Sequence, residues 1–150
     1  MPLTHGSAVV TLPGDLEPGL LSTRFELRAH ADAVADARRR VRRQLRRWAF
    51  PPELCDTAQL LVSELFTNAV LHTDSATVGC VLRAGGNRLR VEVRDTGSGT
   101  GMPAPRDVAP EDERGRGLLL VDTFAEEWGV ERAGPRGGCL VWFALGPVTT

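Results

Sequence analysis

The sequence contains no lysine, no isoleucine and no tyrosine, so all 18 basic residues are arginines. The absence of lysine excludes three kinds of protein that depend on this side chain. They are P-loop NTPases with their Walker lysine, enzymes of the common protein-kinase fold with its strand lysine, and enzymes that form a Schiff base.

The sequence also has few cysteines, no long apolar run and almost no net charge. The three cysteines, Cys55, Cys80 and Cys139, are far apart and form no CxxC pair, as is typical of free thiols in a reducing cytosol. No apolar run approaches the ~20 residues of a membrane span, and the N-terminus lacks the pattern of a signal peptide. The formal net charge of -1 argues against general binding of nucleic acid or anionic membranes. We therefore expect a cytoplasmic protein that binds neither nucleic acid nor membranes.

The length of 150 residues suits one domain, but the ends of the chain differ from its middle. Residues 1–21 carry several prolines and glycines and predict a flexible N-terminal arm, with at most a short strand at 8–12. The remainder divides into a domain at 22–146 and a tail at 147–150.

Periodic patterns within the domain predict an α/β fold. Apolar and charged residues alternate at 88–94, as in a half-buried strand, and the apolar stripe at 31–48 indicates an amphipathic helix. In order, the expected elements are a strand at 24–28, helices at 31–48 and 53–71, strands at 76–83 and 88–94, a loop at 96–114, a helix at 118–124, and strands at 127–132 and 139–145. This order favours an α+β two-layer sandwich, with a mixed, mainly antiparallel sheet and helices on one face. Residues 139–145 are apolar on both faces and should form a central strand.

The second predicted helix carries a row of polar residues. Glu64, Asn68 and His72 recur every fourth residue, which places them along one side. The flanking leucines are Leu61 and Leu65 on one side and Leu60 and Leu71 on the other. Polar groups among leucines need partners, because their unpaired burial is unfavourable, so a ligand is a candidate. An Asn oxygen suits Mg²⁺, and the Glu could accept a proton from an attacking hydroxyl or water. The alternative is a solvated helix face or an internal capping pair.

A second motif, Asp95-x-Gly97-x-Gly99, follows the strand at 88–94. A carboxylate at this point could accept a hydrogen bond from the exocyclic amine of adenine, and the glycines would let the backbone approach a ligand closely. The same pattern also describes ordinary turns. The relaxed dinucleotide motif from Gly99 to Ala104 is rejected, because it contains Pro103 and no helix follows it.

A third motif, Gly115-x-Gly117-Leu118, opens the predicted helix at 118–124. Glycines at a helix start expose free backbone N–H groups and the positive end of the helix dipole, which together bind phosphate. Without a ligand, the same residues describe an ordinary helix start.

The order of these three motifs resembles that of the GHKL superfamily of ATPases and kinases, and most of all the small bacterial anti-sigma-factor serine/threonine kinases. The resemblance covers residues of about 22–146. It implies a Bergerat ATP-binding fold with ATP and Mg²⁺ as cofactors. It also implies that Glu64 is the general base, that Asn68 holds Mg²⁺, that Asp95 holds adenine and that residues 98–116 form the ATP lid. The implied cofactor-binding residues are Asn68, His72, Asp95, Gly97, Gly99, Arg114, Gly115, Arg116, Gly117 and Leu118.

The resemblance implies a protein that phosphorylates Ser or Thr on a small antagonist and regulates transcription by switching partners with a sigma factor. It is also consistent with a homodimer. Two alternatives remain: a nucleotide-dependent adaptor or anti-sigma factor with little or no kinase activity, and a degenerate domain that binds no nucleotide. Arg114 and Arg116 could clamp phosphates or could simply be solvated.

The first predicted helix is crowded with arginines, and two interpretations remain open. Asp36 and Arg40 have the spacing of a helical ion pair, and the two aspartates of the helix precede its arginines, as the helix dipole favours. These features describe a solvated face. The other interpretation is a docking surface for an acidic partner. The arginines are Arg38, Arg39, Arg40, Arg42, Arg43, Arg46 and Arg47.

Overall fold

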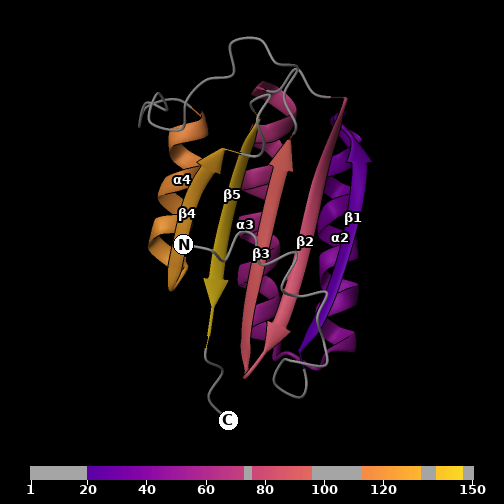
Figure 1. Ribbon diagram of the computed structural model, residues 1–150, viewed down its shortest axis with the longest axis vertical. Coiled ribbons are helices and arrows are strands. Elements are labelled where there is room, and N and C mark those ends of the chain that lie inside the picture. The colour runs from indigo at the N-terminus through magenta and orange to yellow at the C-terminus, as the bar shows by residue number, and fades with distance from the viewer. Residues whose placement is uncertain (1–19, 73–75, 96–112, 133–137, 147–150) are drawn as a thin grey trace.

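The computed structural model describes residues 20–72, 76–95, 113–132 and 138–146; for His72 and residues 113–117 it describes the backbone alone. Within these ranges the chain forms three helices and five strands (Figure 1). In chain order they are β1 (Leu21–Arg28), α2 (Asp32–Arg47), α3 (Pro52–His72), β2 (Thr77–Gly85), β3 (Arg88–Asp95), α4 (Glu113–Phe124), β4 (Glu127–Arg132) and β5 (Cys139–Leu145).

The five strands form one open sheet in the order β1-β2-β3-β5-β4, and every neighbouring pair is antiparallel. The β2–β3 turn has Gly86 and Asn87 at φ of 58° and 65°. Positive φ at both central residues gives the turn the twist of the flanking strands, and Gly and Asn tolerate this conformation best. Strand β5, predicted to be central, lies inside the sheet between β3 and β4, although the middle strand of the five is β3.

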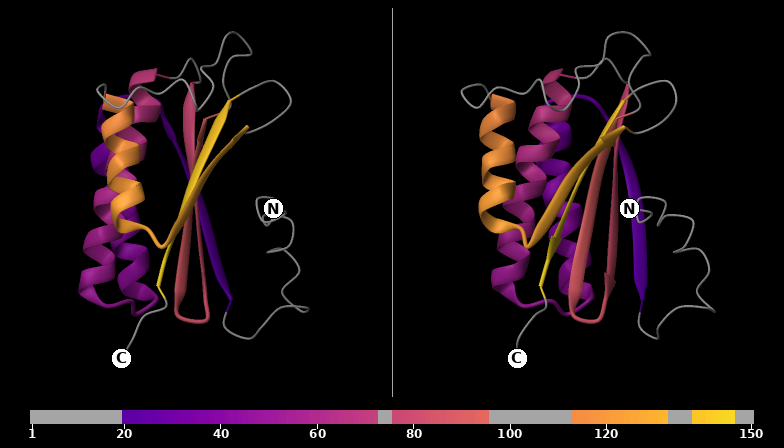
Figure 2. Two further views of the ribbon diagram at one scale, coloured as in Figure 1. Left: turned by 90° about the vertical axis from the view of Figure 1, so that its left-hand side faces the viewer. Right: turned by 60° about the vertical axis from the view of Figure 1, so that its left-hand side comes forward.

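The three helices lie side by side on one face of the sheet, with α3 between α2 and α4 (Figure 2). Alternate strand residues such as Leu82, Val91 and Phe143 meet the helices and are fully buried. From the helices, Leu45 and Phe66 enter the same core. Burying one such side chain stabilises the fold by about 1.5–3 kcal/mol. The predicted α+β two-layer architecture is confirmed.

The connection between α2 and α3 follows from the end of α2. The N–H of Phe50 donates to the carbonyl of Leu45 at 3.0 Å, and the N–H of Ala49 donates to that of Arg46 at 3.0 Å. These two bonds form a Schellman motif, in which the residue at Ala49 takes a positive φ, here 65°. Two prolines then prevent α2 from continuing, and Pro52 begins α3, as its fixed φ favours.

The sheet face that points away from the helices carries a buried charged cluster. Glu92 on β3 is 1% exposed, and its Oε2 accepts hydrogen bonds from Arg83 at 2.5 Å and from Arg90 at 3.1 Å. The Arg90 guanidinium stacks on the Trp142 ring at 4.0 Å from its centroid. Alternation predicted that this face is exposed to solvent, yet Arg83 and Glu92 are buried. Their burial is tolerated because the opposite charges on adjacent strands neutralise one another.

One strand and one helix begin earlier than predicted. Strand β1 begins at Leu21 rather than at residue 24, because Leu21 already pairs with Ala84. Helix α4 begins at Glu113 rather than at Leu118, so the prediction that Gly115 and Gly117 precede the helix was wrong: they lie inside its first two turns. The other predicted elements are confirmed to within two residues.

Some predictions fall outside the described residues. They are the short strand at 8–12 and most of the loop at 96–114. The division into arm, domain and tail stays a prediction. Among the described residues, no helix is long and apolar enough to cross a membrane.

The three cysteines all lie in described segments, and none of them forms a disulfide bond. Cys55 and Cys80 are buried, and burial raises the pKa of both thiols. A thiol that resists ionisation is a poor nucleophile, so these two cysteines serve packing rather than chemistry.

Candidate functional site

Helix α3 carries the first predicted motif on its second half. Glu64 and Asn68 are both half-buried and lie one turn apart. Leu61 and Leu65, beside this pair, are 0% and 3% exposed. The leucines predicted for the other side are not buried: Leu60 is 39% exposed and Leu71 is 55% exposed. The polar pair therefore lies at the border between the core and the surface.

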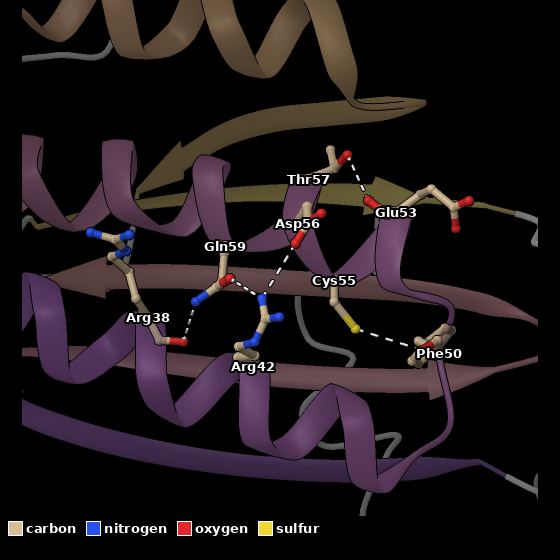
Figure 3. Close-up of polar contacts among 8 residues, drawn as sticks. All are labelled: Arg38, Arg42, Phe50, Glu53, Cys55, Asp56, Thr57 and Gln59. Carbon is tan, nitrogen blue, oxygen red and sulfur yellow. Dashed lines mark hydrogen bonds and ion pairs between the residues drawn. The ribbon is translucent and has the colours of Figure 1, made fainter.

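The first half of α3 offers a reference, because two of its polar side chains, Asp56 and Gln59, are bound by α2 (Figure 3). Arg42 donates to Gln59 at 2.7 Å and to Asp56 at 3.3 Å, and the Gln59 amide donates to the carbonyl of Arg38 at 3.2 Å. Since each residue turns a helix by about 100°, Asn68 lies about 180° around α3 from Gln59. It thus faces away from α2, on the side where α4 packs (Figure 1).

Within the described part of the chain, Glu64 and Asn68 have no comparable contacts. Within the described ranges, no hydrogen bond or ion pair joins either side chain to a protein group. A carboxylate and an amide at the border of a hydrophobic core are favourable only if water or a ligand satisfies them.

Asp95 ends β3 on the face of the sheet that meets the helices. It shares this face with Val93 and lies opposite Val78 and Cys139 on the neighbouring strands. The Asp95 side chain is buried, with 6% exposed, so a carboxylate stands at the end of an otherwise apolar row.

The three motifs converge at one end of the molecule. The C-terminal end of α3, the C-terminal end of β3 and the first turn of α4 all lie at the top of Figure 1, and both views of Figure 2 agree. Because α3 packs against both β3 and α4, these ends are neighbours in space. The first turn of α4 carries free backbone N–H groups, as every helix start does.

A comparison with protein families identifies the domain. The model of the histidine kinase-like ATPase domain matches residues 27–143, from β1 to β5. The chain belongs to this family. An ATPase domain implies an ATP-binding site.

Two solved structures share the fold of this histidine kinase-like ATPase domain. One holds the RsbU and RsbW domains of Rv1364c from Mycobacterium tuberculosis, at a TM-score of 0.64 and 18% identity over 83% of this chain. This chain spans only 31% of the length of that one. The other is the SiaB-SiaC complex from Pseudomonas aeruginosa, at a TM-score of 0.62 and 10% identity, covering 95% of this chain and 99% of that one. No curated protein matches the sequence.

The residues of the ATPase domain fit a nucleotide and Mg²⁺. Mg²⁺ uses few protein oxygens and completes its shell with phosphates and water, so one amide without a protein partner is a suitable ligand. The described residues contain no cluster of three or more His, Cys, Asp or Glu side chains that could hold a metal by themselves. A single amide oxygen suits a metal whose other ligands are phosphates and water.

Several predicted site residues are not tested by these contacts. Gly97 and Gly99 lie outside the described residues, and no side chain is described for His72, Arg114 or Arg116. Gly115, Gly117 and Leu118 lie in α4, where Leu118 packs against the core. Their roles toward a ligand stay predictions.

The reasoning from sequence missed two residues that lie beside the arginines of α2. Arg24 and Phe25 on β1 join three arginines of α2 around a groove. Alternation separates Arg24 from Phe25, and only the position of β1 at the sheet edge lets both reach one groove. No pattern in the sequence shows which strand lies at the edge of the sheet, so these residues could not be assigned to one groove from the sequence.

Proposed function

We propose that this chain is a Mg²⁺-ATP-dependent serine/threonine kinase of the anti-sigma-factor type, which phosphorylates a small antagonist protein and thereby regulates transcription by partner switching. The observation that carries the proposal is the pair Glu64 and Asn68, half-buried on α3 without a protein partner among the described residues, at the end where β3 delivers Asp95. Membership in the histidine kinase-like ATPase domain family and the likeness to structures that contain RsbW and SiaB support it.

Each residue would have a distinct task. The Asp95 carboxylate would accept a hydrogen bond from the adenine amine, and the Asn68 side-chain oxygen would bind Mg²⁺. Glu64, one turn before Asn68, would accept the proton of the attacking Ser or Thr hydroxyl. Bound Mg²⁺ would neutralise the charge of the phosphates.

The start of α4 would bind phosphate. Free N–H groups in its first turn, around Gly115, would donate to phosphate oxygens. Gly117, Leu118, Arg114 and Arg116 would support or extend this contact, and His72, at the end of α3, would lie near the phosphates. Gly97 and Gly99 would let the chain pass close to the adenine.

The test is phosphoryl transfer by a Glu64→Gln variant. Wild type and variant are incubated with Mg²⁺, labelled ATP and candidate antagonist domains, and labelled Ser or Thr is identified by mass spectrometry. The variant should bind ADP normally and transfer about 10²- to 10⁴-fold more slowly, because only the base is lost.

Glu53→Gln is the matched control for this test. Glu53 lies in the first turn of the same helix, where its side chain is exposed. It should leave both binding and transfer unchanged. Full transfer by Glu64→Gln would show that Glu64 is not the base.

A second function is favoured by the arginine groove, which lies against α2 rather than at the top end of α3. The chain could act as a nucleotide-dependent adaptor or anti-sigma factor that captures a partner with little or no transfer. A pull-down with and without ATP separates the two. Capture of a partner that never gains phosphate supports the adaptor, and capture with phosphorylation supports the kinase.

A further inference from the structure

A groove of about 150 Å³ lies between the edge strand β1 and helix α2. Four arginines line it: Arg24 from β1, and Arg40, Arg43 and Arg47 from α2. The spacing of the last three, at i, i+3 and i+7, places them on one side of α2.

Among the described residues, most arginines of this groove have no carboxylate partner. Asp36 accepts from Arg40 at 3.1 Å. For Arg24, Arg43 and Arg47, no carboxylate of the described residues lies within 4.0 Å. Arg42 shows the contrast, since on the other side of α2 it is held by Asp56 and Gln59 (Figure 3).

The groove also has an apolar wall and an open strand beside it. Arg40 lies over the Phe25 ring at 5.4 Å, and Phe25 stacks on Phe66 at 6.2 Å. Among the described strands, β1 pairs with β2 alone, so one row of its backbone N–H and C=O groups is not used by the sheet. Such an edge can accept an additional strand.

Charge is distributed very unevenly along the chain. Seven arginines against two aspartates give α2 a formal charge of +5. Because the whole chain is at -1, the rest of it carries −6. A uniformly basic protein would attract any polyanion, whereas here the net positive charge is concentrated on α2.

From these features we infer that the groove binds an extended, acidic segment of a partner protein. Carboxylates of the segment pair with Arg43, Arg47 and Arg24, and its backbone adds to the free edge of β1. A nucleic acid could use the arginines but not the strand edge, which is why a peptide fits better. This contact requires no nucleotide and does not depend on the proposed kinase activity.

The test uses a labelled eight-residue peptide of alternating Glu and Val, which matches the eight residues of β1. Its binding to the full chain without nucleotide is followed by fluorescence anisotropy. Wild type should bind, and more weakly as salt rises. Arg43→Gln with Arg47→Gln should weaken binding about tenfold. Hydrogen exchange should slow at residues 21–28 when the peptide binds.

The matched control is Arg38→Gln with Arg46→Gln, which removes the same charge from the same helix outside the groove. This pair should change affinity less than about twofold. Equal losses in both pairs would indicate diffuse attraction and overturn the inference.

Three other results would also overturn it. They are a wild type that does not bind the peptide, a thymidine oligonucleotide of equal charge that binds as tightly, and residues 21–28 that remain unprotected. Light scattering adds a fourth, since self-association that excludes the peptide would assign the groove to a second copy of the chain. Calorimetry with ADP on the same samples reports separately whether the nucleotide site works.

Discussion

The two halves of α3 differ in how their polar side chains are satisfied. In the first half, Asp56 and Gln59 are bound by groups of α2. In the second half, Glu64 and Asn68 have the same chemical types but no protein partner among the described residues. The difference separates polar groups that join the helices from polar groups that are available to a ligand.

The same distinction extends to the sheet. Glu92 is held by two arginines and is 1% exposed, so it belongs with the groups that hold the fold. If the distinction is correct, substitutions of held groups should lower stability, and substitutions of available groups should leave stability intact and impair binding.

The largest effect on stability is expected at Glu92. Replacing it with Ala leaves Arg83 and Arg90, whose side chains are 8% and 16% exposed, without their carboxylate. Removing one partner of a buried ion pair lowers the free energy of unfolding by about 3–5 kcal/mol. Urea unfolding measures this loss.

Glu26→Ala is the control for Glu92. Glu26 is an exposed residue of the edge strand β1, on the same face of the sheet, and should change stability by at most about 0.5 kcal/mol. A loss at Glu92 no larger than that at Glu26 would mean that the cluster does not hold the sheet.

A smaller loss is expected for Gly129→Ala beneath the same cluster. A Cβ at Gly129 would lie 2.6 Å from Nε1 of Trp142, so the ring, and Arg90 stacked on it, must move. Such overpacking destabilises by about 1–3 kcal/mol. At Gly79 the added Cβ meets atoms no nearer than 3.6 Å, so Gly79→Ala should be tolerated better. Equal melting temperatures for the two variants would contradict this packing.

Within α3, Gln59→Ala should lower stability by about 1 kcal/mol. The substitution removes the acceptor for Arg42 and the donor for the carbonyl of Arg38. Urea unfolding of Arg42→Ala and of the double variant completes the test. If the bond matters, the two losses are not additive, whereas simple addition would show that the pair contributes nothing.

The smallest effect on stability is expected for Asn68→Ala. Among the described residues no hydrogen bond or ion pair is lost, and Ala favours a helix more than Asn by a few tenths of a kcal/mol, so stability should stay constant or rise slightly. A loss as large as that of Gln59→Ala, measured by the same unfolding curve, would place Asn68 among the groups that hold the fold.

Local patterns predicted most of the fold. The alternation at 88–94 predicted strand β3, and the apolar stripe at 31–48 predicted helix α2. The start of α4 was missed, because Gly115 and Gly117 disfavour a helix by about 1 kcal/mol each and only packing of α4 against α3 compensates for them.

The candidate site was predicted in part, because spacing along one helix is a local property. The sequence placed Glu64 and Asn68 on one side of α3, but it could not tell that only one flank of the pair is buried. It could not join Glu92 to Arg83 across the hairpin as a buried pair, since both alternate as exposed residues should. Contacts of this kind depend on which strands and helices become neighbours.

The most direct test of the account is calorimetry of ADP and ATP binding with and without Mg²⁺. Wild type should bind both nucleotides, Asp95→Asn should abolish binding, and Asn68→Ala should retain binding while losing its dependence on Mg²⁺. Asp56→Ala, from the held half of α3, should bind as wild type does. A wild type that binds no nucleotide, or an Asp95→Asn variant that binds normally, would contradict the claim that the available half of α3 and the end of β3 form an ATP site.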